Sequence, residues 1–179
     1  MKHGLILGVG LVLLGVIAGP LLAAGTSEVR SLAGVKALRV VVEDLNPAMQ
    51  KTGLRKEQLQ AVAEQQLVKS GLTVLQPQER TTVPMVYIRL SSVIGGNSKS
   101  APISFYLIVQ VKQLALLAPG VRLAFQTVEA PAAAPLLVTT WENGTMVMLD
   151  RSELFFYVGQ TLTNLLGDLV HDYQQANKK

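Results

Sequence analysis

The sequence predicts an α+β fold: a mostly antiparallel sheet of about four or five strands, with two helices packed on one face and an N-terminal hydrophobic helix in front. Residues 38–44 and 85–93 alternate apolar and polar side chains, as strands do. Residues 55–69 and 151–175 repeat apolar side chains at helical spacing. Because each of these two helices has one apolar stripe, we expect both to cover the same face of the sheet.

The composition narrows the class of protein. The chain has 179 residues, of which 49% are hydrophobic and 16% are charged, with no cysteine and a net charge of +4. The missing cysteine excludes disulfides, thiolate metal sites, cysteine catalysis and a lipidated N-terminal cysteine. The basic residues are scattered and there is one tryptophan, which disfavours nucleic-acid binding.

Residues 1–25 are predicted to be a signal peptide or a retained transmembrane anchor. Gly4–Ala24 holds 21 uncharged residues, Lys2 precedes them, and the small residues Ala23, Ala24 and Gly25 close the segment. This layout is typical of a bacterial secretory signal cleaved after Ala24 or Gly25. The mean hydropathy of the whole chain, +0.35, owes much to this segment.

The same segment is also long enough to remain in the membrane, since such a helix spans roughly 30 Å. Four of its glycines fall on one helix face, where they would let another membrane helix approach closely: Gly4, Gly8, Gly15 and Gly19. Either way, residues 26–179 are expected to be exported across the inner membrane as an α+β domain. The domain would be soluble in the periplasm after cleavage, or anchored by residues 4–24 without it.

The first half of the exported domain is predicted to run strand, helix, strand. Asn46-Pro47 ends the strand at 38–44. The helix at 55–69 has the stripe Leu59, Val62, Ala63 and Leu67. Gly71 is placed to take the left-handed conformation that ends a helix, with a short strand at 72–75 beyond it.

The second half is predicted to be antiparallel strands followed by a long helix. After the strand at 85–93, residues 94–100 form a turn and 103–117 a long strand. Pro119-Gly120 then returns the chain as a hairpin strand at 121–128. We expect a further strand at 136–141, a turn at 142–145, and a short extended piece at 146–149. Asp150 and Glu153 have capping-box spacing for the last helix, whose predicted stripe is Phe155, Val158, Leu162, Leu165, Leu169 and Tyr173.

These segments resemble a group of small, uncharacterised bacterial exported proteins. The likeness rests on the run Leu32–Leu45, on Gly53-Leu54, on Gln66-Leu67, on Gly71–Leu75 and on Thr139-Thr-Trp141. Trp141, Tyr173 and Asn177 occupy the places of a tryptophan after the last long strand and of a C-terminal helix ending near Tyr and Asn. The segment Leu114–Pro135 departs from the group by being long and apolar. The element order is also similar to the amino-terminal domain of the Tol-system propeller protein, an analogy of fold alone.

The residues indicate no catalytic or metal site. The exported domain has one histidine, His171, near Asp168 and Asp172 on the last helix. This is a poor zinc set and is typical of a solvated helix end. The loop Gly95–Ser100 lacks the spacing of a phosphate loop. We therefore expect a protein that is not an enzyme and takes no cofactor or metal.

Two surfaces are candidates for an interaction. One is the sheet face opposite the helices, with residue types enriched at interfaces: Tyr87, Arg89, Tyr106, Ile108, Lys112 and Trp141. The same face would also suit an ordinary sheet open to water. The second is the apolar hairpin, with Leu114, Leu116, Leu123 and Phe125.

The expected function is that of a non-enzymatic envelope protein: a protein-binding module or accessory subunit of a membrane complex. Its expected partner is an envelope or membrane protein, with membrane contact through the N-terminal helix if it is not cleaved. The alternative is a periplasmic carrier or sensor of an apolar small ligand held between helices and sheet.

Overall fold

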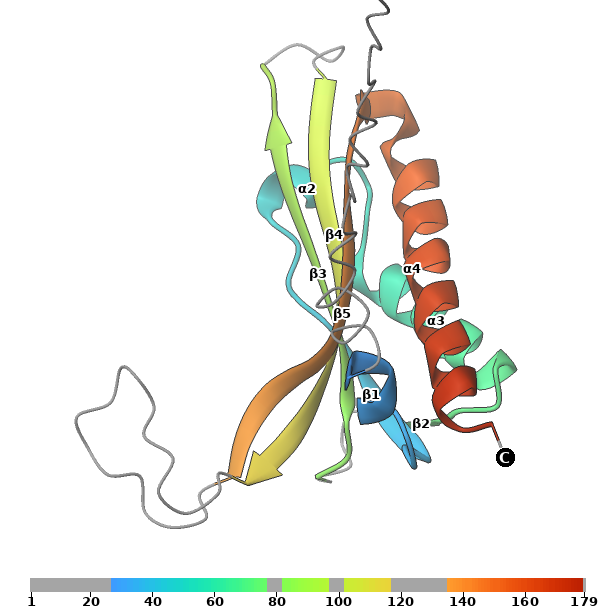
Figure 1. Ribbon diagram of the computed structural model, residues 1–179. Coiled ribbons are helices and arrows are strands. Elements are labelled where there is room, and N and C mark those ends of the chain that lie inside the picture. The colour runs from blue at the N-terminus through green and yellow to red at the C-terminus, as the bar shows by residue number, and fades with distance from the viewer. Residues whose placement is uncertain (1–26, 77–81, 97–101, 117–134, 179) are drawn as a thin grey trace, which may run out of the picture.

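The computed structural model describes residues 27–76, 82–96, 102–116 and 135–178, so the predicted leader lies outside the described residues. Residues 27–31 form a short helix. The elements after it are β1 (Ala37–Val42), α2 (Pro47–Gln50), α3 (Lys56–Lys69), β2 (Thr73–Leu75), β3 (Met85–Ile94), β4 (Pro102–Leu116), β5 (Pro135–Asp150), a 3-10 turn (Arg151–Glu153) and α4 (Leu154–Ala176). Figure 1 shows α3 and α4 together on one side of the sheet.

The sheet has five strands in the order β2-β1-β3-β4-β5. The α+β class is confirmed, but a mostly antiparallel sheet is wrong. β1 runs parallel to both of its neighbours, while β3, β4 and β5 pair antiparallel. The reason lies in the connection: α3 carries the chain back along the sheet, so β2 starts at the same end as β1. A period of two in the sequence does not encode the direction of the neighbouring strand.

Local signals set the ends of the first elements. Asn46 caps α2 by accepting a hydrogen bond from the Met49 backbone N–H at 2.9 Å, and Pro47 occupies the first turn. Gly71 adopts φ +85° just beyond α3, as predicted, and Leu72 N–H donates to the Leu67 carbonyl at 3.2 Å. The chain thereby turns sharply from α3 into β2.

Apolar side chains of α3, α4 and one sheet face form the core. Leu59, Ala63 and Leu67 of α3 are buried as predicted, whereas Val62 is 37% exposed. On α4 the predicted Val158, Leu162, Leu165 and Leu169 are buried, and so are Leu154, Thr161 and Leu166; Phe155 is 57% exposed. The sheet contributes alternate residues of the long strands: Val86, Ile88, Leu90, Ile103, Phe105, Leu107, Val109 and Val111.

β5 and the start of α4 differ from the prediction. Residues 142–145 are not a turn, because β5 continues through them as one strand to Asp150. Asn143 donates to Asp168 of α4 at 2.9 Å, and Gly144 pairs with Ile108. These tertiary contacts override the turn preference of Asn-Gly. The side chain of Asp150 makes no capping bond, so the predicted capping box is wrong and a 3-10 turn precedes α4.

The first described residues are tied to the end of α4. Asn177 accepts a hydrogen bond from Gly34 N–H at 2.8 Å and donates to the carbonyls of Leu32 and Tyr173 at 3.1 and 2.8 Å. Ser31 adds a bond from its hydroxyl to the Thr140 carbonyl at 3.1 Å. The segment 27–34 and the C-terminal helix are therefore fastened at one end of the sheet.

A bulge in β5 decides where Trp141 points. Val111 pairs with Trp141 and Lys112 pairs with Thr139, which leaves Thr140 as an extra residue. A bulge of this kind shifts the alternation of faces by one residue. Trp141 consequently faces the helices, is 2% exposed, and donates from Nε1 to Asp172 Oδ2 of α4 at 2.9 Å. The prediction that Trp141 lies on the face opposite the helices is wrong, because Trp141 pairs with the core residue Val111 and its indole bonds to α4.

We expect Trp141 and Asp172 to be coupled by about 1–2 kcal/mol, because a hydrogen bond from a buried indole to a charged acceptor exceeds an ordinary one. Chemical unfolding of Trp141→Phe, Asp172→Ala and the double variant gives the coupling free energy. The exposed Asn143–Asp168 bond serves as the matched control and should give a smaller value. A Trp141–Asp172 coupling no larger than the control would contradict this role.

Candidate functional site

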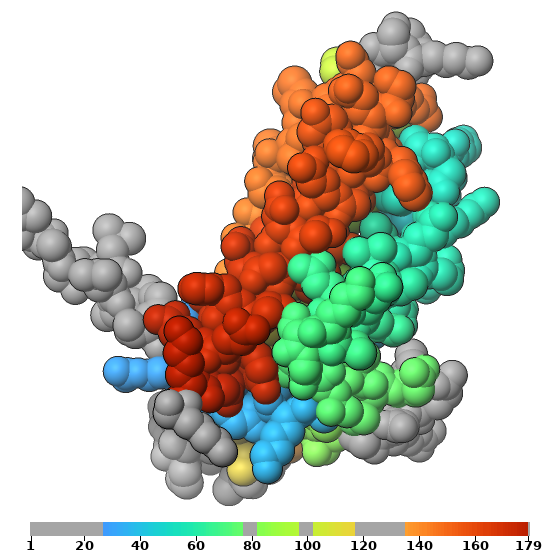
Figure 2. Space-filling view, turned by 90° about the vertical axis from the view of Figure 1, so that its right-hand side faces the viewer, coloured from blue at the N-terminus to red at the C-terminus, as the bar shows by residue number. Residues whose placement is uncertain are grey.

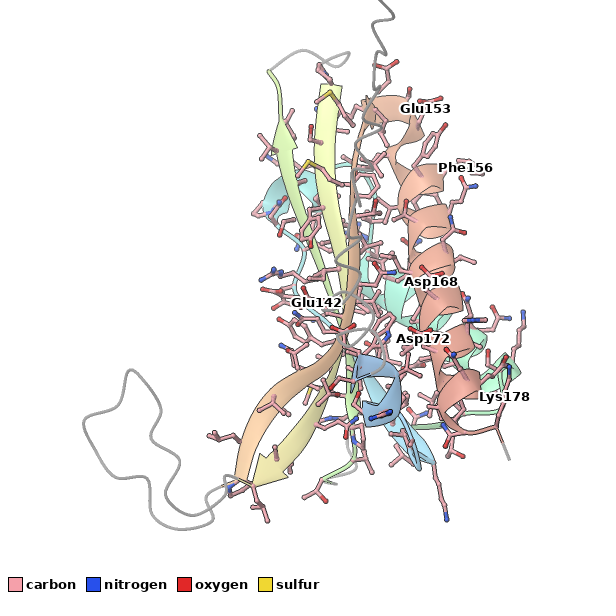
Figure 3. All side chains as sticks on the ribbon, in the orientation of Figure 1. Glu142, Glu153, Phe156, Asp168, Asp172 and Lys178 are labelled. Atoms are coloured by element: carbon pink, nitrogen blue, oxygen red, sulfur yellow. The ribbon has the colours of Figure 1, made fainter. Side chains whose placement is uncertain are left out.

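The sheet face that α3 and α4 leave uncovered is the candidate site and is here called the open face. Its side chains alternate with the core residues along β3, β4 and β5. In Figure 3 the side chains on this side project away from α4. Its members on these strands are Tyr87, Arg89, Ser91, Val93, Ser104, Tyr106, Ile108, Gln110, Lys112, Glu142, Gly144, Met146 and Met148.

Tyr87 is the centre of a charged cluster on the open face. The Lys112 Nζ lies 3.7 Å from the centroid of the Tyr87 ring, which is cation–π geometry. Partial burial raises the pKa of the Tyr87 phenol above its usual value near 10, and a hydrogen bond with Glu43 and the charge of Glu43 raise it further. The charge of Arg89 acts in the opposite direction. The phenol therefore stays neutral and hydrogen-bonded across physiological pH.

Ile108 is a buried residue on the open face. It is 3% exposed, although α3 and α4 cover the other side of the sheet. Arg89 is its partner on β3 and Gly144 is its partner on β5. A Cβ at Gly144 would lie 2.8 Å from the Tyr106 hydroxyl, so the Tyr106 ring occupies the space that this glycine leaves. Long neighbouring side chains thus close over Ile108, which itself is not available for contact.

One end of the open face is apolar and exposed. Val93, Met146 and Met148 are 72%, 74% and 74% exposed. The register places Met148 beside Ser104, which pairs with Val93, so the three residues share neighbouring rows of the sheet. Exposed methionines of this kind adapt their shape to a partner surface.

Four of the predicted interface residues lie together on the open face where other side chains or solvent can reach them. Arg89 is exposed, and Tyr87, Tyr106 and Lys112 are half-buried. Leu114 and Leu116 are 44% and 70% exposed on the part of the β4–β5 ribbon that extends beyond its pairing with β3. Leu123, Phe125 and the four leader glycines, Gly4, Gly8, Gly15 and Gly19, lie outside the described residues.

Sequence reasoning missed several members of the site. Glu43 was expected to point the same way as Arg39 and Val41 but was not assigned to the site, and Glu142 was expected only as part of a turn. Met146 and Met148 were assigned to a short extended piece with no face. The spacing of these two methionines is a signal that could have found them, since residues two apart on a strand share a face.

The carboxylates near His171 have structural partners. Asp168 accepts a hydrogen bond from Asn143, and Asp172 accepts one from Trp141, each at 2.9 Å. His171 itself is exposed. The two aspartates therefore hold α4 against β5. Within the described ranges, no group of three or more His, Cys, Asp or Glu side chains is arranged to hold a metal ion.

Two hollows at the surface are lined by described residues. One, of about 190 Å³, lies between Asp44 and the start of α3, where Lys56 pairs with Asp44 at 2.5 Å. The other, of about 440 Å³, is lined by Met148, Asp150 and Tyr157 among others. Beneath the middle of α4, Val158, Leu162 and Leu166 are fully buried. The larger hollow lies between the end of β5 and the first turn of α4, and neither hollow is lined by residues from the middle of α4.

No helix in the part of the chain that the structure describes has the length and hydropathy to cross a membrane. No protein-family model matches the chain. No curated protein matches it either. Among solved structures, the chain is similar to a minor lipoprotein from Acinetobacter baumannii, at 9% identity and a TM-score of 0.38, over 80% of this chain and 93% of that one. A likeness at this level says nothing about what the chain does.

We expect Glu43→Gln to lower the pKa of Tyr87, because it removes a negative charge that disfavours the phenolate. Because the pKa of Tyr87 is raised in the folded state, the interaction stabilises the fold fully at pH values below the tyrosine pKa of the unfolded chain, near 10. This stabilisation is lost as the pH rises through the pKa of Tyr87 in the folded state. The pKa of Tyr87 is measured by an alkaline NMR titration of protein with ¹³C-labelled tyrosines. Tyr157, on α4 and therefore on the other side of the sheet, is the internal control. An unchanged Tyr87 pKa in the variant would contradict the contact.

Proposed function

We propose that this chain is a non-enzymatic protein of the bacterial envelope, in which residues 26–179 form an exported protein-binding module. The export rests on the sequence of residues 1–25, which has the layout of a secretory signal or membrane anchor. In either form the module lies beyond the inner membrane, where its partner is an envelope or membrane protein. The role that fits is an accessory subunit of a membrane complex.

The observation that carries the proposal is the makeup of the open face. α3 and α4 complete the core on the other side of the sheet. The domain therefore does not need a covering element on the open face in order to fold. It presents two tyrosines, an exposed arginine and two exposed methionines around the buried Ile108. Tyr, Arg and Met are enriched at protein interfaces, and a dry centre with a polar rim is their usual anatomy.

One buried polar atom belongs to a side chain on the same side of the sheet as the open face. Arg39 lies on β1, where it pairs with Met85, and Met85 pairs with Lys112. The Nε atom of Arg39 is buried and has no hydrogen-bond partner among the described residues. A buried donor without an acceptor costs about 1–3 kcal/mol.

The packing beneath the middle of α4 favours a binding module over a carrier of an apolar ligand, because Val158, Leu162 and Leu166 are fully buried there. Asp168 and Asp172, the carboxylates nearest to His171 in sequence, hold α4 to β5. A binding module needs only the open face and its rim.

We expect a photo-cross-linking amino acid at Arg89 to capture a partner protein in living cells, because Arg89 is exposed on the open face. The matched control is the same substitution at Val68 on α3, which is 56% exposed on the opposite side of the sheet. Immunoblotting of membrane and periplasmic fractions measures the product. Mass spectrometry of the same bands gives the native N-terminus and the partner.

A discrete adduct from Arg89 that is absent from Val68 supports the proposal. Equal labelling from both positions, or none from either, would contradict it. A native N-terminus after residue 25 together with a monomer that cross-links to nothing would remove the accessory-subunit role.

A further inference from the structure

β5 forms one edge of the sheet, and this edge is long. β5 spans 16 residues, whereas the strand at the other edge, β2, spans three. An edge strand presents a row of backbone N–H and C=O groups that have no partner within the sheet. Figure 2 shows the orange atoms of β5 at the surface along one flank of α4.

The pattern of hydrogen bonds between neighbouring strands shows which backbone N–H and C=O groups of β5 point away from β4. Gly95 N–H bonds to the Pro102 carbonyl, so the even-numbered residues of β4 bond to β3. The odd-numbered residues of β4 then bond to β5, at Asn143, Thr145 and Val147. The backbone groups of the intervening residues face away from the sheet: Glu142, Gly144, Met146 and Met148.

From Glu142 to Met148 this edge has no lysine, proline or bulge. Natural edge strands carry lysine, proline, bulges or a covering segment. No Lys, Arg or Pro occurs from 136 to 150. The bulge at Thr140 interrupts the edge, and the Ser31 hydroxyl bonds to its carbonyl at 3.1 Å. Beyond the bulge, no described strand pairs with the outer side of Glu142–Met148.

Carboxylates flank the edge on both sides. Glu142 is on the open face, and Asp168 and Asp172 are on α4, as Figure 3 shows. Asp150 and Glu153 lie at the end of β5 and in the turn after it. The only salt bridge in the described ranges is Lys56–Asp44. None of these five carboxylates forms a salt bridge in the described ranges. Glu142 accepts a hydrogen bond from Gln110, and the nearest cations in sequence are Arg151 and Lys178.

We infer that the outer edge of β5, from Glu142 to Met148, accepts an extended strand of a partner protein that carries lysine or arginine side chains. The backbone ladder would supply affinity, Met146 and Met148 would contact apolar side chains of the added strand, and the carboxylates would select its basic residues. This inference rests on the proposed function and gives it a mode of binding. A second copy of this chain fits less well, because two β5 edges would bring two acidic rims together.

The test uses the native, processed protein and a synthetic peptide as long as Glu142–Met148 with alternating lysine and valine. Fluorescence anisotropy measures the Kd, and NMR amide exchange reports on the edge. We expect the amides of Gly144, Met146 and Met148 to exchange more slowly with peptide present. Met146→Pro should weaken binding about tenfold, because proline removes an outward-facing donor and spares the bonds to β4.

Three controls separate the strand from simple charge attraction. Met146→Val keeps the N–H and should bind like the parent protein. A peptide with glutamate in place of lysine should bind about tenfold more weakly, since like charges then face each other. A lysine peptide N-methylated at alternate residues should not bind, and this control holds even if Met146→Pro fails to fold.

Two results would overturn the inference. One is that the lysine peptide still binds after it is N-methylated and still binds the Met146→Pro variant. Binding would then be due to charge attraction, without backbone hydrogen bonds between the peptide and β5. The other is full protection of the edge amides before peptide is added, with a dimer by sedimentation if a second copy covers them. If the peptide behaves as expected but Arg89 cross-links to nothing, the edge inference stands and the proposed function fails. If Arg89 cross-links to a partner but the peptide does not bind, the proposed function stands and the edge inference fails.

Discussion

The packing of α3 and α4 on a single face of the sheet is the constraint from which the other features follow. Each fully buried leucine or valine in that layer contributes about 1.5–3 kcal/mol, and the layer includes Leu67, Val158, Leu162 and Leu166. Because both helices occupy one face, the open face is left to solvent or a partner. α4 packs on the face of β4 and β5 and does not pair with the outer side of β5. Since no described strand pairs there either, β5 is an edge strand.

The bulge at Thr140 affects which residues of β5 lie on each face of the sheet. The extra residue turns Trp141 toward α4, where Asp172 receives its indole N–H. Beyond the bulge the alternation continues with Glu142, Gly144, Met146 and Met148 on the open face. A single inserted residue therefore places the indole in the core and aligns the methionines with the outward-facing backbone groups.

Much of the fold could be predicted from the sequence, because long elements have strong periodicity. The strands at 85–93 and 103–117 and the helix at 55–69 match β3, β4 and α3 within a residue or two at each end. Strand direction could not be predicted, since parallel and antiparallel neighbours leave the same alternation in a half-buried strand. The turn expected at Glu142–Thr145 failed because Asn143 bonds to a distant helix and Gly144 is covered by Tyr106. Alternation placed Tyr87, Arg89, Tyr106, Ile108 and Lys112 of β3 and β4 on the open face. Trp141 was misplaced because no signal in the sequence marks the bulge beside it.

The bonds of Asn177 to residues 32 and 34 have a mechanical consequence. If residues 4–24 stay in the bilayer, any pull on the domain enters at residue 27, and these bonds pass the load directly to the last turn of α4. The force then runs along the helix and into its broad apolar contact with the sheet, a shearing geometry in which many contacts share the load. Because residue 34 also leads directly into β1, a tether would load the sheet and the last turn of α4 together.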